Sequence, residues 1–385
     1  MTTSVTIPNV AGKNPLKGLL DYGQSPWMDY IRRDLLTGGG LKKMIDEDGL
    51  RGQTSNPTIF EKAITGSDLY KDILESPDAK KLDAKGIYEK VAIGDVQDAC
   101  DIFKPVYQET KRRDGYVSLE VSPYLGNDTQ GTLEEARRLW KAVGRENLMV
   151  KVPATPEGIP AIRQLLEEGV NINITLLFAQ SAYEKVAEAY LAALEARAAK
   201  GQDVSHIASV ASFFVSRIDT LIDSMIEEKV KSATVENRAL LESIEGKVAI
   251  ANAKLTYKKY QELFSGARWK ALADKGAQTQ RLLWASTSTK NKKYRDVLYV
   301  EELIGKDTVD TIPPATFDAF RDHGKLRNSL TEDVPGAAKT MENLQKAGIS
   351  MKEVTEKLVV DGVKLFADAF TQLLAATGKS AGVRA

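Results

Sequence analysis

Short runs of apolar or alternating residues recur along the chain, and longer stretches with helical periodicity separate them. This alternation is typical of parallel strands joined by helical crossovers. Strand-like runs occur at 24–31, 50–56, 116–122, 147–153, 170–178, 206–214, 281–288 and 309–315. Because eight parallel strands can close on themselves, the pattern predicts an α/β protein that folds as a single (β/α)8 TIM barrel.

The clearest helix pattern lies between the third and fourth runs. Thr132 and Glu135 have the spacing of a capping box, in which each side chain binds the backbone N–H of the other residue. The apolar residues that follow share one helical face as far as Gly144. The sequence therefore predicts a crossover helix that begins at Thr132 and stops at Gly144.

Three longer segments predict helices beyond the minimal crossovers. Segments 60–107 and 218–275 have room for extra helices, and 351–376 has the spacing of a final amphipathic helix that could brace the barrel or cover its mouth. No fixed repeat and no long linker marks a second unit. We expect a single domain over 1–385, in which 316–377 is a C-terminal helical extension that packs on the barrel.

Polar residues in the strand-like runs follow parity. Successive side chains of a strand point to opposite faces, so residues of one parity line the interior of a barrel. In the third run Ser118 and Glu120 alternate with apolar residues, and in the fifth Asn173 and Thr175 do the same. The same count puts Thr54, Asn56, Lys151, Ser212 and Phe214 inside, and Asp29 on one face with Trp27. Most of these lie near the carboxyl ends of the strands, which favours an active site over a structural polar core.

A single lysine, Lys151, stands inside the apolar run 148–153. Burial disfavours the charged form of an amine, so this lysine can be nucleophilic enough to form a Schiff base with a ketone. The alternatives are a lysine that reaches out to solvent at the strand end and one partner of a buried ion pair. An isolated charge in a barrel interior is costly, whereas an amine and a carboxylate together offset one another.

The composition limits which classes of ligand and which catalytic residues the protein can use. Lys plus Arg number 53, as do Asp plus Glu, so no global charge favours nucleic acid or an anionic membrane. One cysteine, and no signal-peptide pattern in 1–10, favour a cytoplasmic protein. Two histidines leave little for zinc sites or Ser-His-Asp triads, and no metal is expected. The chemistry must use lysine and carboxylates on a small ligand.

Several motifs stand in a fixed order along the chain. They are WMD at 27–29, QTSNPTIF at 53–60, SLEVSP at 118–123, VKVPAT at 150–155, NINITLLF at 171–178, SFFVSRI at 212–218 and WAST at 284–287. Together they resemble the transaldolase family, in its longer bacterial form, over nearly the whole chain. The resemblance implies a cofactor-free enzyme of the pentose phosphate pathway, with sugar phosphates as its small-molecule partners and a monomer or a homodimer left open. It would transfer a dihydroxyacetone unit from sedoheptulose 7-phosphate or fructose 6-phosphate to glyceraldehyde 3-phosphate or erythrose 4-phosphate.

The resemblance also implies a role for each polar residue of the interior. Lys151 would form the Schiff base, which accepts electrons when the C3–C4 bond breaks. Asp29 would take the proton of the C4 hydroxyl, and Glu120 would move protons through a water that Thr175 helps to hold. The substrate-binding residues would be Thr54, Asn56, Asn173, Ser212 and Phe214.

Simpler interpretations stay open for several of these residues. Asn56 could shape the turn before Pro57, and Thr175 could be an ordinary strand threonine. Glu120 could instead be one partner of an ordinary ion pair, for example with Lys151.

Asp29 has two structural alternatives of its own. As a favoured N-cap residue, it could cap a helix that begins near Tyr30. It could also pair with Arg32 or Arg33. Both compete with the role of base that the resemblance implies.

The phosphate of the substrate requires a cationic site. Arg217 has the planar fork that binds phosphate oxygens in pairs, and Ser286 offers a hydroxyl. Shorter members of the family carry an arginine just after the equivalent serine, and this chain does not. Lys290 is expected to take its place, with a solvated loop lysine as the alternative.

Two other functions compete with transfer. A related class I aldolase would cleave fructose 6-phosphate and release free dihydroxyacetone. Relatives of that kind tend to carry a tyrosine at the position of Phe214, whose phenol could protonate the carbanion, so this residue favours transfer. A barrel that binds sugar phosphates without turnover is the second alternative.

Overall fold

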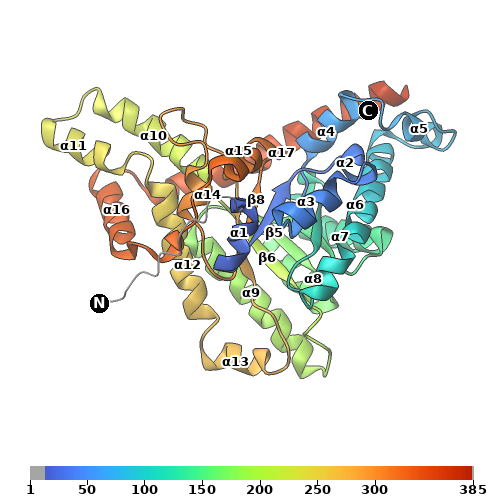
Figure 1. Ribbon diagram of the computed structural model, residues 1–385, viewed down its shortest axis with the longest axis horizontal. Coiled ribbons are helices and arrows are strands. Elements are labelled where there is room, and N and C mark those ends of the chain that lie inside the picture. Colours follow the sequence, from blue (N-terminus) through green and yellow to red (C-terminus); the bar gives the residue numbers. More distant parts are fainter. Residues whose placement is uncertain (1–13, 384–385) are drawn as a thin grey trace.

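The predicted strands close into one barrel. The computed structural model describes residues 14–383, and in it eight parallel strands follow the order of the sequence, with β1 paired to both β2 and β8. Figure 1 shows the helices that surround these strands. The strands are β1 Gln24–Asp29, β2 Gly52–Thr54, β3 Tyr116–Glu120, β4 Leu148–Pro153, β5 Ile172–Leu177, β6 Ser209–Phe214, β7 Arg281–Ala285 and β8 Thr308–Ile312. The (β/α)8 prediction is confirmed. Each strand is shorter than its predicted run because the runs include loop residues.

The register of neighbouring strands brings polar residues together near the carboxyl ends. Glu120 of β3 lies opposite Lys151 of β4, and Lys151 lies opposite Asn173 of β5. Val150 and Val152, of the other parity, are fully buried in the apolar core. An amine and a carboxylate therefore share the interior because the side chains of β3 and β4 alternate in step.

An ion pair fills the amino end of the barrel. Arg281 of β7 binds Asp114, from the loop before β3, at 2.8 Å. Ser25 donates to Asp114 at 2.8 Å and accepts from Arg281 at 2.8 Å, and Trp27 is buried beside them. Because these buried charges are paired and hydrogen-bonded, the polar cluster is tolerated there.

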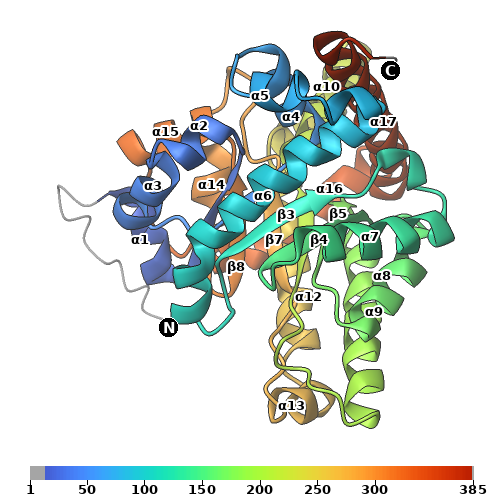
Figure 2. The ribbon, with the colours of Figure 1, turned by 90° about the vertical axis from the view of Figure 1, so that its right-hand side faces the viewer.

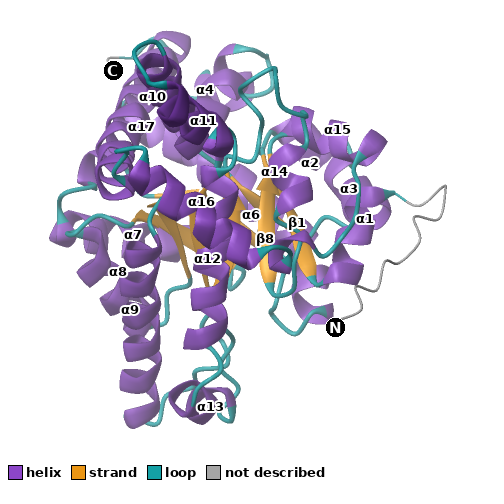
Figure 3. Cartoon of the chain, turned by 90° about the vertical axis from the view of Figure 1, so that its left-hand side faces the viewer, coloured by secondary structure: helices purple, strands orange, loops and turns teal. Residues whose placement is uncertain are grey.

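Helices occupy every crossover of the barrel. They are α1 Pro15–Gly18, α2 Arg33–Thr37, α3 Gly40–Asp48, α4 Pro57–Thr65, α5 Lys71–Leu74, α6 Ala84–Glu109, α7 Thr129–Val143, α8 Gly158–Glu168, α9 Gln180–Ala199, α10 Ser216–Val230, α11 Val235–Ile244, α12 Val248–Leu263, α13 Ala267–Ala273, α14 Leu298–Glu302, α15 Pro314–His323, α16 Val334–Lys346 and α17 Met351–Ala381. The extra helices predicted in 60–107 and 218–275 are confirmed. Figure 3 shows α9 and α12 side by side, extending away from the barrel to α13.

The predicted start of the helix after β3 is wrong. α7 begins earlier, at Thr129, and Asp128 caps it. Thr132 instead donates to a loop carbonyl, and Glu135 accepts a backbone N–H from the segment before the helix at 2.6 Å. The predicted stop at Gly144 is confirmed, in the left-handed conformation that glycine adopts without strain.

The long helix α17 covers the mouth of the barrel. It packs against α4 and α6 and reaches the carboxyl end of β5 (Figure 2). The approach is closest at Gly362, where a Cβ would lie 2.9 Å from Cδ2 of Leu176. One turn further along, Phe366 lines the cavity of the barrel. Of the two roles expected for the final helix, covering the mouth is thus confirmed.

No helix within residues 14–383 is both long enough and apolar enough to cross a membrane. The stretch 1–10, in which the sequence shows no signal-peptide pattern, lies outside the described residues. Cys100 is a free thiol buried in α6.

Candidate active site

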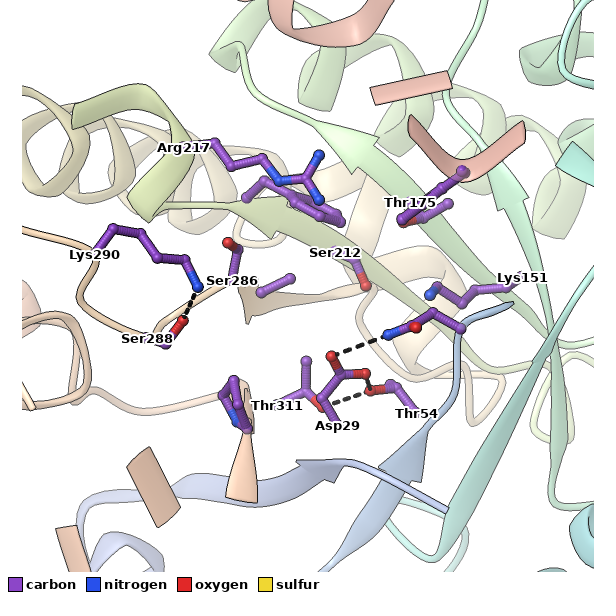
Figure 4. A pocket seen from close by; sticks show the side chains of 15 residues that line it. Asp29, Thr54, Lys151, Thr175, Ser212, Arg217, Ser286, Ser288, Lys290 and Thr311 are labelled. Atoms are coloured by element: carbon purple, nitrogen blue, oxygen red, sulfur yellow. Dashed lines mark hydrogen bonds between the residues drawn. The ribbon is translucent and has the colours of Figure 1, made fainter. Parts of the chain in front are cut away.

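A cavity of about 150 Å³ lies at the carboxyl ends of the strands (Figure 4). Its lining consists of Asp29, Thr54, Asn56, Lys151, Thr175, Ser212, Phe214, Arg217, Ala285, Ser286, Ser288, Lys290, Thr311, Pro313 and Phe366. Every predicted site residue lines it except Glu120 and Asn173, which are buried in the barrel. Parity and motif order together therefore identified residues that the fold does bring into one place.

Lys151 is held inside the barrel, with a side chain that is 6% exposed. Its Nζ donates to the carbonyl of Ser55 at 3.1 Å and lies 3.5 Å from Oε2 of Glu120. The ring of Phe366 covers it, with the ring centroid 5.8 Å from Nζ. The lysine does not reach out to solvent, and an enclosed amine that faces a cavity beside a carboxyl group is suited to nucleophilic catalysis.

Glu120 is buried, and this burial raises the pKa of its carboxyl group, while the charge of Lys151 acts in the opposite direction. Its Oε2 has no hydrogen-bond partner within residues 14–383. A second cavity of about 10 Å³, lined also by Tyr88 and Glu135, lies against it on the side of α6 and α7. That is space for about one water. A carboxyl group with a raised pKa beside such a space can give and take protons.

Asp29, at the end of β1, lines the same cavity as Lys151. It accepts from Oγ1 of Thr54 at 2.7 Å and from Nδ2 of Asn56 at 3.4 Å (Figure 4). Burial raises the pKa of Asp29, and the charge of Lys151 and the bond from Thr54 oppose that rise. Both donors hold the carboxylate in the cavity, where it can accept a proton from a bound hydroxyl.

The two structural alternatives for Asp29 are wrong. α2 begins only at Arg33, with Arg32 as its N-cap residue, so Asp29 caps no helix. Arg32 pairs with Asp34, and Arg33 pairs with two other carboxylates. The carboxylate of Asp29 lines the cavity instead.

Asn56 confirms the turn interpretation and also reaches the cavity. Its Oδ1 accepts from the N–H of Ile59 at 3.1 Å and so caps α4, whose first residue is Pro57. Its Nδ2 points to Asp29 at the same time. An amide side chain can do both because it carries an acceptor and a donor at its end.

Asn173 lies at the centre of a buried chain of hydrogen bonds. It donates to Oγ of Ser118 at 3.0 Å and accepts from Oγ of Ser212 at 2.6 Å. Two residues on, Thr175 lines the cavity, and its Oγ1 has no partner within residues 14–383. Its neighbour Leu176 has φ of 61°, where the register between β5 and β6 shifts. Thr175 thus places an unpaired hydroxyl at the cavity within the described residues, and its role stays a prediction.

Cations gather on the side of the cavity away from Lys151 (Figure 4). Arg217, in the first turn of α10, forms no hydrogen bond or ion pair within residues 14–383 and contacts aromatic rings instead. At the exposed rim Nζ of Lys290 donates to Oγ of Ser288 at 2.7 Å, and Ser286 shares a hydrogen bond with Ser216. Burial lowers the pKa of both cations, and the charge of Arg217 lowers that of Lys290 further. Two neighbouring cations with hydroxyls between them suit an anion.

Some lining residues were not predicted. They are Ala285, Ser288, Thr311, Pro313 and Phe366. Thr311 binds Thr54 through their hydroxyls at 2.7 Å, and the parity of the last strand could have found it. Phe366 comes from α17, and no local pattern says where a distant helix packs.

A closed barrel whose strand ends gather an enclosed amine, carboxyl groups and unpaired cations is a (β/α)8-barrel enzyme. Comparison with known proteins narrows this class. The chain belongs to the transaldolase/fructose-6-phosphate aldolase family, whose model matches residues 26–377.

Similar proteins cover almost the full length of the chain. A protein of Trichodesmium erythraeum named "Transaldolase" is 50% identical over 364 residues, which are 94% of this chain and 96% of that protein. "Transaldolase 2" of Nostoc punctiforme is 47% identical, with the same shares covered. "Transaldolase" of Thiobacillus denitrificans is 44% identical over 95% of this chain and the whole of that protein.

Proposed function

We propose that this protein is a transaldolase, which moves a dihydroxyacetone unit from a ketose phosphate to an aldose phosphate through a Schiff base on Lys151. One observation carries the proposal. The amine of Lys151 is enclosed 3.5 Å from Glu120 and shares one cavity with Asp29 and with the unpaired cation Arg217. The names of the similar proteins support the same activity.

The first half of the reaction uses the residues in order. The amine of Lys151 attacks the ketone, and Glu120, whose pKa is raised by burial, gives a proton to the oxygen that leaves as water. Asp29 then takes the proton of the C4 hydroxyl, and the C3–C4 bond breaks toward the iminium, which accepts the electron pair. The second half runs these steps in reverse with another aldose phosphate.

Binding would be divided between two sides of the cavity. Thr54, Asn56 and Ser212 face the sugar chain, while Arg217, Ser286 and Lys290 hold the phosphate. Asn173 does not line the cavity and would act indirectly, because it holds the side chain of Ser212 through a hydrogen bond of 2.6 Å.

Transfer is favoured over simple cleavage by the residue at 214. Phe214 has no hydroxyl, and no tyrosine is among the described residues that line the cavity. The carbanion would therefore lack a phenol to protonate it before the acceptor arrives.

The wider setting forms part of the proposal. We infer that the chain works as a single domain in the cytoplasm, with 316–377 as its helical extension, and that it acts on sugar phosphates and not on nucleic acid. The even balance of charges supports the last point.

Borohydride reduction in the presence of fructose 6-phosphate tests the mechanism. A covalent adduct is expected on the peptide that contains Lys151, and the Lys290→Ala variant should still form it. An unlabelled protein would contradict the proposal and favour a barrel that binds sugar phosphates without turnover. A coupled assay with and without erythrose 4-phosphate then separates transfer from cleavage.

A further inference from the structure

We propose that Phe366 keeps water away from the three-carbon intermediate on Lys151, and thereby determines whether the unit is transferred or released. This inference rests on the proposed function and deepens it. Phe366 belongs to none of the motifs in the barrel strands, because it comes from α17, after the barrel is complete.

The ring of Phe366 covers both functional ends of the cavity. Its centroid lies 5.8 Å from Nζ of Lys151 and 5.9 Å from Cζ of Arg217. Phe214 packs on the same guanidinium, with its centroid 5.3 Å from Cζ. A ketose phosphate whose carbonyl carbon is at Lys151 and whose phosphate is at Arg217 would therefore lie beneath the ring of Phe366.

Helix packing holds this ring in place. One turn before it, Gly362 is buried so close to Leu176 that a Cβ would lie 2.9 Å from Cδ2. One turn after it, Phe370 packs edge-on against Tyr88, with ring centroids 5.6 Å apart. Residues four apart lie on one face of a helix, so the contacts of Gly362 and Phe370 fix the position of the helix face that carries Phe366. The packing of α17 therefore holds the ring over the cavity.

The intermediate needs protection once the first product has left. Cleavage of the C3–C4 bond sends its electron pair into the iminium, leaves an enamine on Lys151 and frees an aldose phosphate, whose former hydroxyl proton is on Asp29. Departure of that product empties the space beneath Phe366. Water that entered there could protonate C3 and then hydrolyse the imine, which would release dihydroxyacetone and restore the amine. A large apolar ring over this space excludes such water.

The ratio of release to transfer tests this role. Release is measured as glyceraldehyde 3-phosphate formed from fructose 6-phosphate alone, and transfer as sedoheptulose 7-phosphate formed when erythrose 4-phosphate is added. In Phe366→Ala the ratio is expected to rise at least about tenfold, and in Phe366→Leu by less. Leu365→Ala is the matched control, because it removes a side chain of the same helical turn that is 53% exposed. Its ratio should equal that of the unmodified protein.

The outcomes separate this inference from the proposed function. A Phe366→Ala variant that transfers the unit with an unchanged ratio overturns the inference, as does an equal rise in Leu365→Ala, which would indicate general loosening of α17. If Phe366→Ala does not fold, the ratio in Phe366→Leu decides in the same way. Absence of any transfer by the unmodified protein would instead contradict the proposed function.

Discussion

Nζ of Lys151 and Oε2 of Glu120 lie 3.5 Å apart on adjacent strands, whose register places the two residues opposite each other. Neither backbone has to move for the amine and the carboxyl group to meet. Side chains on strands are held more precisely than side chains on loops, which would suit the proposed reaction, because it moves protons at several steps. The pair also explains why an amine is tolerated inside a barrel.

Replacing Lys151 with alanine should abolish transfer, by at least about 1,000-fold, because it removes the amine that is proposed to form the Schiff base. The free energy of unfolding should change little, since Glu120 can stay neutral in its buried place. The coupled assay and urea unfolding measure the two effects. Retention of transfer in Lys151→Ala would show that the covalent mechanism is wrong.

Arg217→Ala should raise KM for phosphorylated sugars and leave kcat closer to its original value. Hydrogen bonds to a charged group contribute about 1.5–3 kcal/mol, which corresponds to roughly 10- to 150-fold in KM. Lys293→Ala is the control, because this lysine is exposed and bound to Glu245. Steady-state kinetics with fructose 6-phosphate measures this effect. If the KM of Arg217→Ala equalled that of the unmodified protein, Arg217 would not belong to the proposed phosphate site.

Two glycines in helices should respond to alanine in opposite ways. At Gly94 of α6 a Cβ meets nothing within 4 Å, so Gly94→Ala should stabilise the protein by up to about 1 kcal/mol through helix propensity. At Gly362 the Cβ would lie 2.9 Å from Cδ2 of Leu176, which neighbours Thr175, so either this side chain or α17 has to shift. Gly362→Ala should therefore lose activity without the gain in stability. Thermal unfolding and the transfer assay compare the pair, and equal behaviour would argue against tight seating of α17.

Asp310 should make stability depend on pH. Burial raises the pKa of its carboxyl group to about 8, against a weaker opposing effect of the bond from Thr287. The folded protein therefore holds a proton that the unfolded chain, with an ordinary pKa of 3.8, gives up. This contribution is complete below about pH 4 and is lost as the pH rises toward about 8.

The Asp310→Asn variant keeps an acceptor for Thr287 and cannot ionise. At pH 8 it should be more stable than the unmodified protein, whereas at pH 5 the difference should shrink. Urea unfolding at both values measures this. A variant whose advantage is the same at both values would show that Asp310 does not titrate as inferred.

Strand parity predicted most of the site because the interior of a barrel follows a period of two. Glu120, Lys151 and Thr175 needed only that period and the position of the strand ends. The hydrogen bonds of Asn173 to Ser118 and Ser212 could not be predicted from this period, because they depend on how three strands align. Roles as acid or base came from the resemblance and not from the pattern.

Long-range packing set the limit of prediction from sequence. Glu135 has the spacing of a capping box, yet Asp128 caps α7 and Glu135 serves a backbone N–H outside it. Asp128 and Thr132 are both favoured N-cap residues, so the local sequence does not say which of them begins the helix. Contacts with the rest of the fold decide that Asp128 does. Phe366 could not be assigned to the site for the same reason.

The pairing of Arg281 with Asp114 has a kinetic consequence. Because this pair occupies the amino end of the barrel, we expect both sugars to enter at the carboxyl end, where the cavity lies, and the outgoing aldose to leave before the incoming one binds. The two substrates would then take turns, and double-reciprocal plots would give parallel lines.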